Sequence, residues 1–361
     1  MPGKVSTARQ IVSVLLALTL LPGCDLLLAS GSQPAGTLPA TNTAALAWYS
    51  LYFSAPTGPA SEYYQGGPDE PLAQAIDAAR LSVDMAAYDL NLSSIRDALL
   101  RAHQRGVVVR IVMESDNMDE PEVGDLQNAG IPILGDRREG YMHNKFVVID
   151  RLEVWTGSMN FTANDAYRND NNLIRIRSSQ IAEDYTTEFE EMFVEDLFGP
   201  DKRAATPHPL VSVNGTRIEV YFSPDDGVAA HLLPLLKDAR RSIYFLAFSF
   251  TSDDLAAAML ARAAAGVDVA GVFEKSQVAS NAGDEYETLL DAGLDVRLDG
   301  NPRNMHNKVL IIDEQIVVTG SYNFSSSAEN KNDENLVIIY NAEIAAQYLA
   351  EFQKVMGQAQ K

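Results

Sequence analysis

The chain contains, near its middle, the stretch His143-Asn-Lys-Phe-Val-Val-Ile-Asp150, followed by Gly157-Ser-Met-Asn160. The same spacing of His, Lys, Asp, Gly, Ser and Asn returns in residues 306–313 and 320–323, as His-Asn-Lys-Val-Leu-Ile-Ile-Asp and Gly-Ser-Tyr-Asn. Each of these six residues is separated from its counterpart in the second copy by the same number of positions, the number that separates 143 from 306. One short motif can arise by chance, but two copies with identical internal spacing indicate a duplicated functional unit.

The repeat extends over a whole domain in each half of the chain. A helical pattern at 72–80 matches 232–240, and an apolar strand pattern at 82–88 matches 242–248. Strands that alternate with helices of about ten residues predict an α/β fold with a mixed, mostly parallel sheet in each half. A period this long argues against a solenoid of short repeats. We expect the two domains to pack about a pseudo-two-fold axis, with equivalent residues face to face.

The domain boundaries follow from composition. At 361 residues the chain can hold two domains with separate cores. We predict these domains at 48–199 and 218–361, joined by a polar, proline-containing linker at 200–217. Residues 25–47 are rich in Ser, Gly, Pro, Thr and Ala, a composition typical of a flexible tether.

The first 24 residues have the pattern of a secretion signal. Lys4 and Arg9 precede an apolar run at 11–21, and the chain's only cysteine follows in Leu21-Pro-Gly-Cys24. This tetrapeptide resembles a bacterial lipobox, which implies a lipid on Cys24. The predicted location is the bacterial cell envelope, on the outer side of the cytoplasmic membrane or on an outer membrane. The alternative is a signal cleaved elsewhere, which leaves a free thiol.

Composition excludes some classes of site and disfavours others. A net charge of −21 and a pI near 4.5 disfavour a nucleic-acid partner. They do not exclude a local basic pocket within an otherwise acidic surface. One cysteine rules out an intramolecular disulfide and a multi-cysteine zinc site. The five histidines form no metal-ligand motif, so we predict neither a metal nor a cofactor.

The repeated motif combines residue types that suit phosphate chemistry. His143 and Lys145 are two apart on a predicted strand, so their side chains share a face. Residues 152–156 predict the returning strand of a hairpin, which brings 157–160 back to the histidine. Two such histidines on opposite sides of a phosphate can have different catalytic roles. One attacks phosphorus as the nucleophile, and the other protonates the leaving alkoxide and then activates water. This route needs no metal.

Both halves contribute equal sets to the predicted site. The predicted catalytic residues are His143, Lys145, Asp150, Asn160, His306, Lys308, Asp313, Asn323 and Glu334. The predicted phosphate cradle is Gly157, Ser158, Gly320 and Ser321. Lysine and asparagine would stabilise charge on the non-bridging oxygens in the five-coordinate transition state.

The doubled motif resembles that of the phospholipase D superfamily, and the resemblance covers nearly all of residues 48–361. It implies two tandem α/β sandwich domains, a covalent phosphohistidine intermediate, and hydrolysis or transfer at a phosphodiester. It leaves the substrate open, because the superfamily includes phospholipases, phospholipid synthases and nucleases.

One departure from the family pattern concerns the carboxylate that holds each histidine. The second half has the usual Asn-Asp-Glu334-Asn, whereas the first half has Asn-Asp-Asn171-Asn. If each partner serves the histidine of its own half, Glu334 stabilises an imidazolium at His306 and Asn171 only orients His143. This pairing predicts His143 as the neutral nucleophile and His306 as the cationic acid. Asp170 is the alternative partner in the first half.

Three functions fit the sequence. The first is a phospholipase D-type hydrolase that removes phospholipid head groups at a membrane surface. The second is an endonuclease that cleaves DNA or RNA by the same two-histidine route. The third is an inactive lipoprotein scaffold, which two intact motifs disfavour. Because both motifs lie in one chain, we expect a monomer to suffice for catalysis.

Overall fold

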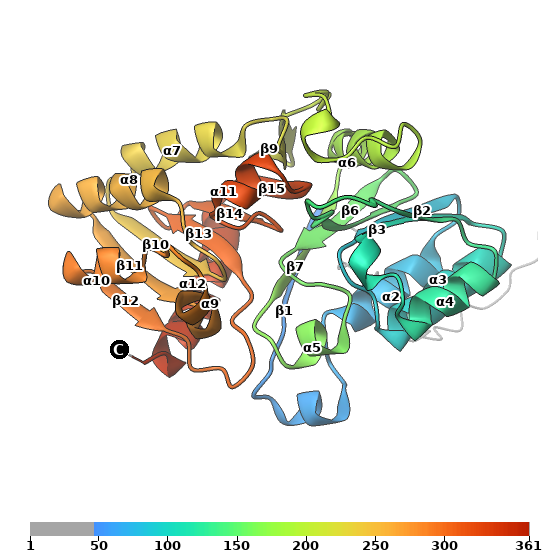
Figure 1. Cartoon of the computed structure of the whole chain (residues 1–361), viewed down its shortest axis with the longest axis horizontal. Coiled ribbons are helices and arrows are strands. Elements are labelled where there is room, and N and C mark those ends of the chain that lie inside the picture. Colours follow the sequence, from blue (N-terminus) through green and yellow to red (C-terminus); the bar gives the residue numbers. More distant parts are fainter. Residues whose placement is uncertain (1–46, 361) are drawn as a thin grey trace, which may run out of the picture. The chain divides into compact units, whose positions relative to one another are not determined.

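The computed structural model describes residues 47–360. The predicted signal segment, Cys24 and all but the last residue of the predicted tether lie outside the described residues. Within the described part, the chain forms two β-sheets, one built from residues 49–177 and the other from residues 210–340 (Figure 1). No helix in this part is both long and apolar enough to span a bilayer.

The first sheet has the strand order β1-β7-β6-β5-β2-β3-β4. Its strands are β1 (Tyr49–Phe53), β2 (Ser82–Ala87), β3 (Val108–Met113), β4 (Ile133–Gly135), β5 (Lys145–Ile149), β6 (Glu153–Gly157) and β7 (Asn172–Arg177). The second sheet repeats this order as β12-β11-β10-β13-β14-β15-β9, with β8 added at the edge. Its strands are β8 (Leu210–Val213), β9 (Thr216–Ser223), β10 (Ser242–Ala247), β11 (Asp268–Phe273), β12 (Asp295–Leu298), β13 (Lys308–Ile312), β14 (Ile316–Gly320) and β15 (Glu334–Tyr340).

The helices follow the same duplicated plan. The first half has α2 (Asp69–Ala78), α3 (Ser93–Gln104), α4 (Pro121–Asn128), α5 (Ala163–Tyr167) and α6 (Ser179–Phe193). The second half has α7 (Val228–Asp238), α8 (Asp253–Ala264), α9 (Lys275–Ser280), α10 (Tyr286–Asp291), α11 (Ser326–Asn330) and α12 (Ala342–Gln358). Short 3₁₀ turns occur at η1 (Pro59–Tyr63), η2 (Ser115–Asn117) and η3 (Gly199–Asp201).

The α/β class and the tandem arrangement are confirmed, but the prediction of mostly parallel sheets is wrong. Only β2, β3 and β4, and likewise β10, β11 and β12, pair in parallel. The remaining pairs are antiparallel. Helices α3 and α4 connect the parallel strands of the first sheet, and α8, α9 and α10 connect those of the second, whereas the motif strand β5 returns through a tight turn into β6. Such a turn permits only antiparallel pairing, so the predicted hairpin is correct and itself limits the parallel share.

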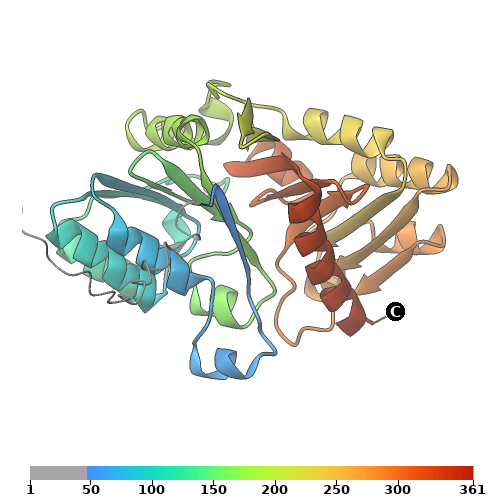
Figure 2. The ribbon, with the colours of Figure 1, turned by 180° about the vertical axis from the view of Figure 1, so that it is seen from behind.

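Each sheet is buried on both faces, which explains the unbroken apolar runs in the motif strands. Along β5, Phe146 and Val148 face a central core, whereas Val147 and Ile149 face an outer core. The outer core of the first half also holds residues of α2, α3 and α4. The central core contains residues of both sheets together with α6 and α12. Figure 2 shows α12 lying across one face of the second sheet, where it contacts β10, β11, β13 and β14.

Contacts between the halves occur in symmetry-related pairs. The backbone N–H of His143 donates to the carbonyl of Asp333, and the N–H of His306 donates to the carbonyl of Asp170, both at 2.9 Å. The Asn335 amide donates to Asn144 at 2.9 Å, and its counterpart Asn172 donates to Asn307 at 2.7 Å. Reciprocal contacts of this kind define an isologous, pseudo-two-fold interface, as the duplication predicts.

Candidate active site

The two histidines line one cavity of about 500 Å³. Each precedes a motif strand by two residues, because β5 begins at Lys145 and β13 at Lys308. Residues of both halves form the walls, among them Tyr88, Tyr141, Phe248 and Asn323. The fold therefore brings two positions that lie far apart in the sequence to the same site, as the repeated motif predicts.

The carboxylate partner of His143 comes from the other half of the chain. Glu334 Oε2 lies 2.6 Å from His143 Nδ1, and its side chain is fully buried. The expectation that Glu334 serves His306 is therefore wrong. The pseudo-two-fold interface is the reason: the N-terminal end of β15 lies beside the residue before His143, through a bridge between Met142 and Asp333.

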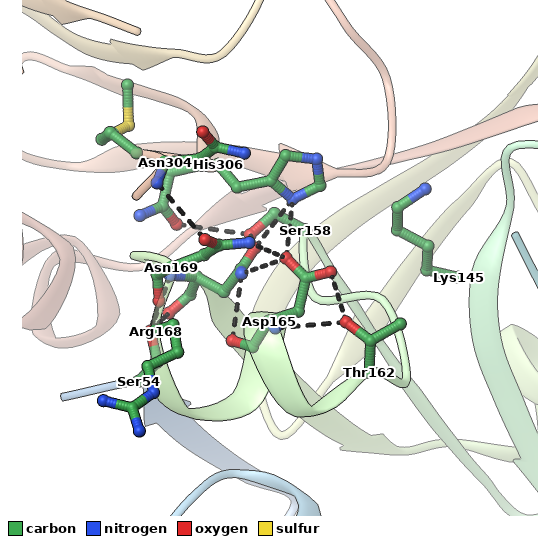
Figure 3. A network of polar contacts seen from close by, with 12 residues as sticks. Ser54, Lys145, Ser158, Thr162, Asp165, Arg168, Asn169, Asn304 and His306 are labelled. Atoms are coloured by element: carbon green, nitrogen blue, oxygen red, sulfur yellow. Dashed lines mark hydrogen bonds and ion pairs between the residues drawn. The ribbon is translucent and has the colours of Figure 1, made fainter. Parts of the chain in front are cut away.

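His306 has the complementary arrangement. Its Nδ1 lies 3.1 Å from Asn171 Oδ1 and 3.4 Å from Asp165 Oδ1 (Figure 3). The alternative partner, Asp170, does not contact the ring of His143; its carboxylate accepts a hydrogen bond from the Asn301 amide at 2.8 Å. Because the partners are exchanged, the pattern of Glu334 and Asn171 no longer supports His143 as the neutral nucleophile.

Sequence reasoning missed Asp165, which is buried against His306. The constant offset of the repeat places Ala328 at the equivalent position in the second half. An unmatched carboxylate shortly before Asn171 was a detectable sequence feature. Its use could not be recognised there, because the histidine that it faces belongs to the other half.

The two motif lysines are held in the same way. Lys145 Nζ donates to the carbonyl of His143 at 2.8 Å, and Lys308 Nζ donates to that of His306 at 2.7 Å. Each ammonium group also lies over an aromatic ring, Tyr88 at 4.9 Å and Phe248 at 4.5 Å. Burial lowers the pKa of Lys145 to about 8. Burial, and then the charge of Lys145, lower the pKa of Lys308 well below its ordinary value.

Burial also disfavours charge on the two imidazoles. It lowers the pKa of His143 well below its ordinary value, and the nearby lysines lower it further. The pKa of His306 is lowered for the same reasons, although Asp165 opposes this shift. Burial raises the pKa of Glu334 to about 8, against the opposing charge of Lys145. An anionic substrate would favour the protonated forms of these lysines and histidines, so binding and proton uptake are linked.

The structure places the motif asparagines at the site. Asn323 lines the cavity, and Asn160 hydrogen-bonds Asp165 through its side chain. The Oδ1 atoms of both asparagines are buried and have no hydrogen-bond partner within the described residues.

The serines and glycines predicted as a phosphate cradle have other contacts. The Ser158 hydroxyl donates to Asn171 Oδ1 at 2.9 Å, and Ser321 hydrogen-bonds Glu334. These serines are fully buried and hold the partners of the histidines. A Cβ at Gly157 would lie 2.3 Å from the Asn172 carbonyl, and one at Gly320 would lie 2.2 Å from that of Asn335. The glycines therefore permit close strand pairing, which corrects the expectation of phosphate contacts.

The motif aspartates also lie away from the cavity. Asp150 accepts hydrogen bonds from the backbone N–H groups of Arg80, Leu81 and Ser82, at distances between 2.6 and 3.1 Å. Asp313 binds the equivalent N–H groups of residues 240–242. Each aspartate follows the end of a strand that begins at the motif lysine, roughly 15 Å along the sheet at about 3.3 Å per residue. Their role is to anchor a turn, and this corrects the prediction of a catalytic role.

Residues 72–193 and 232–356 match the family described as "Cardiolipin synthase, PLD-like domain". The two matches cover more than half of the chain and include both motifs. The chain belongs to this phospholipase D-like family. The resemblance inferred from the motifs is therefore confirmed.

Relatives of this family include proteins with lipid-related names. A "Phospholipase D" of Rickettsia bellii is 32% identical over 160 residues, which are 43% of this chain and 79% of that protein. A "Mitochondrial cardiolipin hydrolase" of Xenopus laevis is 35% identical over 126 residues, which are 34% of this chain and 60% of that protein. Among solved structures, the phosphatidylserine synthase of Haemophilus influenzae matches 85% of both chains with a TM-score of 0.64. At 15% identity, that match shows the fold alone.

As a member of the phospholipase D-like family, the chain is a phosphodiesterase of the hydrolase class. The site has the groups that such chemistry requires, in two symmetry-related sets. Within residues 47–360, no group of three or more His, Cys, Asp or Glu side chains is arranged to hold a metal ion.

Proposed function

We propose that this protein hydrolyses phospholipids at the bond between phosphorus and the head-group oxygen, and releases phosphatidic acid and the free head group. The observation that carries the proposal is the pair of histidines, one from each motif, in a single cavity. Because the Nδ1 atom of each ring contacts Glu334 or Asn171, Nε2 is the nitrogen left for chemistry.

The reaction has two displacements at phosphorus. In the first, Nε2 of one neutral histidine attacks and forms an N–P bond, while the head-group P–O bond breaks and the second histidine gives its proton to the departing alkoxide. In the second, that histidine takes a proton from water, the water oxygen bonds to phosphorus, and the N–P bond breaks. Lys145 and Lys308 stabilise charge on the non-bridging oxygens throughout.

The choice of phospholipid over nucleic acid rests on three observations. Two relatives have names that refer to phospholipid or cardiolipin hydrolysis. The net charge of −21 opposes the binding of a long polyanion. Three aromatic side chains, those of Tyr88, Tyr141 and Phe248, line the cavity and can pack against the apolar part of a lipid.

The test compares substrates with one preparation of the full chain. We would incubate it with mixed micelles of detergent and phosphatidylethanolamine, phosphatidylglycerol or cardiolipin, and separately with single- and double-stranded DNA. Head-group release without DNA cleavage supports the proposal, and DNA cleavage alone would replace it with the endonuclease function. His306→Ala should abolish the activity, whereas His103→Ala, outside the site, should not.

We also propose that a lipid on Cys24 anchors the protein in a bacterial cell envelope and that one chain suffices for catalysis. The apolar run before the chain's only cysteine supports the anchor, and the presence of both motifs in one chain supports the monomer. Fractionation of cells that express the wild type and Cys24→Ser tests the anchor, because the serine variant should leave the membrane fraction. Equal membrane association of the two proteins would contradict it. If the activity elutes with a dimer in size-exclusion chromatography and not with the monomer, the proposal that one chain suffices is contradicted.

A further inference from the structure

The environments of the two histidines differ in the position at which each half of the chain has a carboxylate. At the constant offset of the repeat, Asn171 occupies the position of Glu334, and Asp165 occupies the position of Ala328. The first half therefore has an amide, Asn171, where the second half has a carboxylate, and it has a carboxylate, Asp165, where the second half has an alanine. Both positions lie beside the same ring, that of His306.

Asp165 is built into the site by several contacts. It lies on the short helix α5, is 4% exposed, and its Oδ1 accepts hydrogen bonds from the side-chain amides of Asn171 at 2.7 Å and Asn169 at 2.9 Å. Its Oδ2 accepts the Thr162 hydroxyl at 2.9 Å. Figure 3 shows the carboxylate directed toward His306, at the centre of this network. These contacts fix the carboxylate in one orientation.

Asn171 contacts both the carboxylate and the ring. Its Nδ2 donates to Asp165, and its Oδ1 lies 3.1 Å from His306 Nδ1. A negative charge at one end of an amide polarises the other end and makes its oxygen a stronger acceptor. The charge of Asp165 therefore reaches His306 by two routes, directly over 3.4 Å and through the amide.

The other half has no such relay. Glu334 contacts His143 directly at 2.6 Å, and the position equivalent to Asp165 is Ala328, which is fully buried and apolar. Ser321 hydrogen-bonds Glu334 as Ser158 hydrogen-bonds Asn171. The two environments thus have the same plan, with one carboxylate in one of them and a carboxylate–amide pair in the other.

We propose that Asp165 is a positioning residue for His306, and that Asp165 and Asn171 together take the place that Glu334 alone has beside His143. The pair keeps His306 in the tautomer with a proton on Nδ1 and stabilises positive charge on the ring during the reaction. This proposal rests on the proposed two-histidine chemistry.

The charges around His306 decide the sign of the expected pH effect. Lys308, Lys145 and His143 disfavour a proton on its ring, whereas Asp165 favours one. Burial alone raises the pKa of Asp165, but His306 and the amides of Asn169, Asn160 and Asn171 outweigh burial and lower it. Asp165 is therefore ionised near neutral pH, and removal of its charge should lower the pKa of His306.

The test is a rescue experiment on the full chain, with bis(p-nitrophenyl) phosphate and a phospholipid as substrates. We expect Asp165→Asn and Asp165→Ala to lower kcat by a hundredfold or more, as for other histidines that lose their carboxylate. The limb of the pH–rate profile that belongs to His306 should move to lower pH in Asp165→Asn. The double variant Asp165→Ala/Asn171→Glu restores the plan of the other half and should regain activity to within about tenfold of the wild type.

Two further variants act as controls. Asn171→Glu alone places two carboxylates beside one ring and should be less active than the double variant, because like charges disfavour each other. Asn164→Ala changes an exposed neighbour on α5 and should have the wild-type rate. Circular dichroism melting identifies any variant that fails to fold.

The outcomes separate this proposal from the proposed function. A wild type that hydrolyses neither substrate contradicts the proposed function. An active wild type whose folded Asp165→Asn variant keeps its rate and pH profile contradicts the positioning role. A folded double variant that is no more active than Asp165→Ala also contradicts it, because the charge would then not be the property that Asp165 supplies.

Discussion

Glu334 Oε2 lies 2.6 Å from His143 Nδ1, and the two residues come from different halves of the chain. The contact between Asn171 and His306 crosses between the halves in the opposite direction. Each half therefore orients the histidine of the other, and neither half contains a complete histidine–partner pair. A duplicated chain keeps both motifs in one molecule and makes these crossed contacts intramolecular.

The crossed contact predicts the effect of removing the Glu334 charge. Glu334→Gln should lower kcat about a hundredfold to ten-thousandfold, because an amide permits the wrong tautomer of His143 and stabilises its imidazolium poorly. KM should change little. Glu314→Gln, which makes the same change at an exposed residue of the same half, is the control. A Glu334→Gln enzyme within threefold of the wild-type kcat would show that the contact does not serve catalysis.

The covalent intermediate provides a test of which histidine attacks. With bis(p-nitrophenyl) phosphate, the leaving group needs little protonation, so an enzyme without its acid histidine can form the N–P bond but hydrolyses it slowly. Of His143→Ala and His306→Ala, one should accumulate a phosphoenzyme and the other should form none. Mass spectrometry of acid-sensitive phosphopeptides measures this. If neither variant accumulates a phosphoenzyme, the covalent route is contradicted.

The buried lysines predict a loss of activity at alkaline pH. Burial lowers the pKa of Lys145 to about 8, so in the free enzyme the lysine loses its charge as the pH rises through that value. The pH profile of kcat/KM should therefore fall with an apparent pKa near 8. A bound phosphate favours the ammonium form of Lys145, so the alkaline fall in the pH profile of kcat should occur at higher pH than the fall in kcat/KM. A kcat/KM that does not fall at alkaline pH would contradict this prediction.

A second buried lysine, Lys202, predicts a large effect on stability. Its ammonium group lies 2.5 Å from Glu188, 3.3 Å from Asp225 and 3.6 Å from Asp333, and its side chain is fully buried. Lys202→Met leaves Glu188 and Asp225 without this cation and Asp333 with Arg138 alone, and it should lower the free energy of unfolding by about 3–5 kcal/mol. Denaturant unfolding measures the change, and Arg203→Ala, at an exposed neighbour, should have little effect.

The Lys202→Met effect should depend on pH. Burial raises the pKa of Glu188 to about 8, above its value in an unfolded chain, even with Lys202 present. Without Lys202 that pKa rises further, because an attractive charge is lost. A group whose folded pKa is raised contributes stability at low pH and loses it as the pH rises through that pKa. The destabilisation should therefore be larger at mildly alkaline pH than at mildly acidic pH, and the opposite trend would contradict the assignment.

Much of the fold could be predicted from the sequence because its signals are local. The apolar run between His143 and Asp150 specifies a buried strand, and the residues after it specify the returning strand of a hairpin. The constant offset of the repeat specifies two equivalent domains. The predicted share of parallel strands was wrong because alternating strands and helices indicate which strands can cross over, and do not fix which strands become neighbours in the sheet.

The amino-acid sequence by itself determined the family, the two domains and the histidines and lysines of the site, since these follow from residue types at fixed spacing. Only the tertiary structure decided which side chain holds which histidine. Glu334 and Asn171 have a fixed distance along the chain from the histidine of their own half, but the interface between the halves places each beside the other histidine. Asp165 gains its significance at the same interface, because hydrogen bonds and charge act through space and take no account of sequence separation.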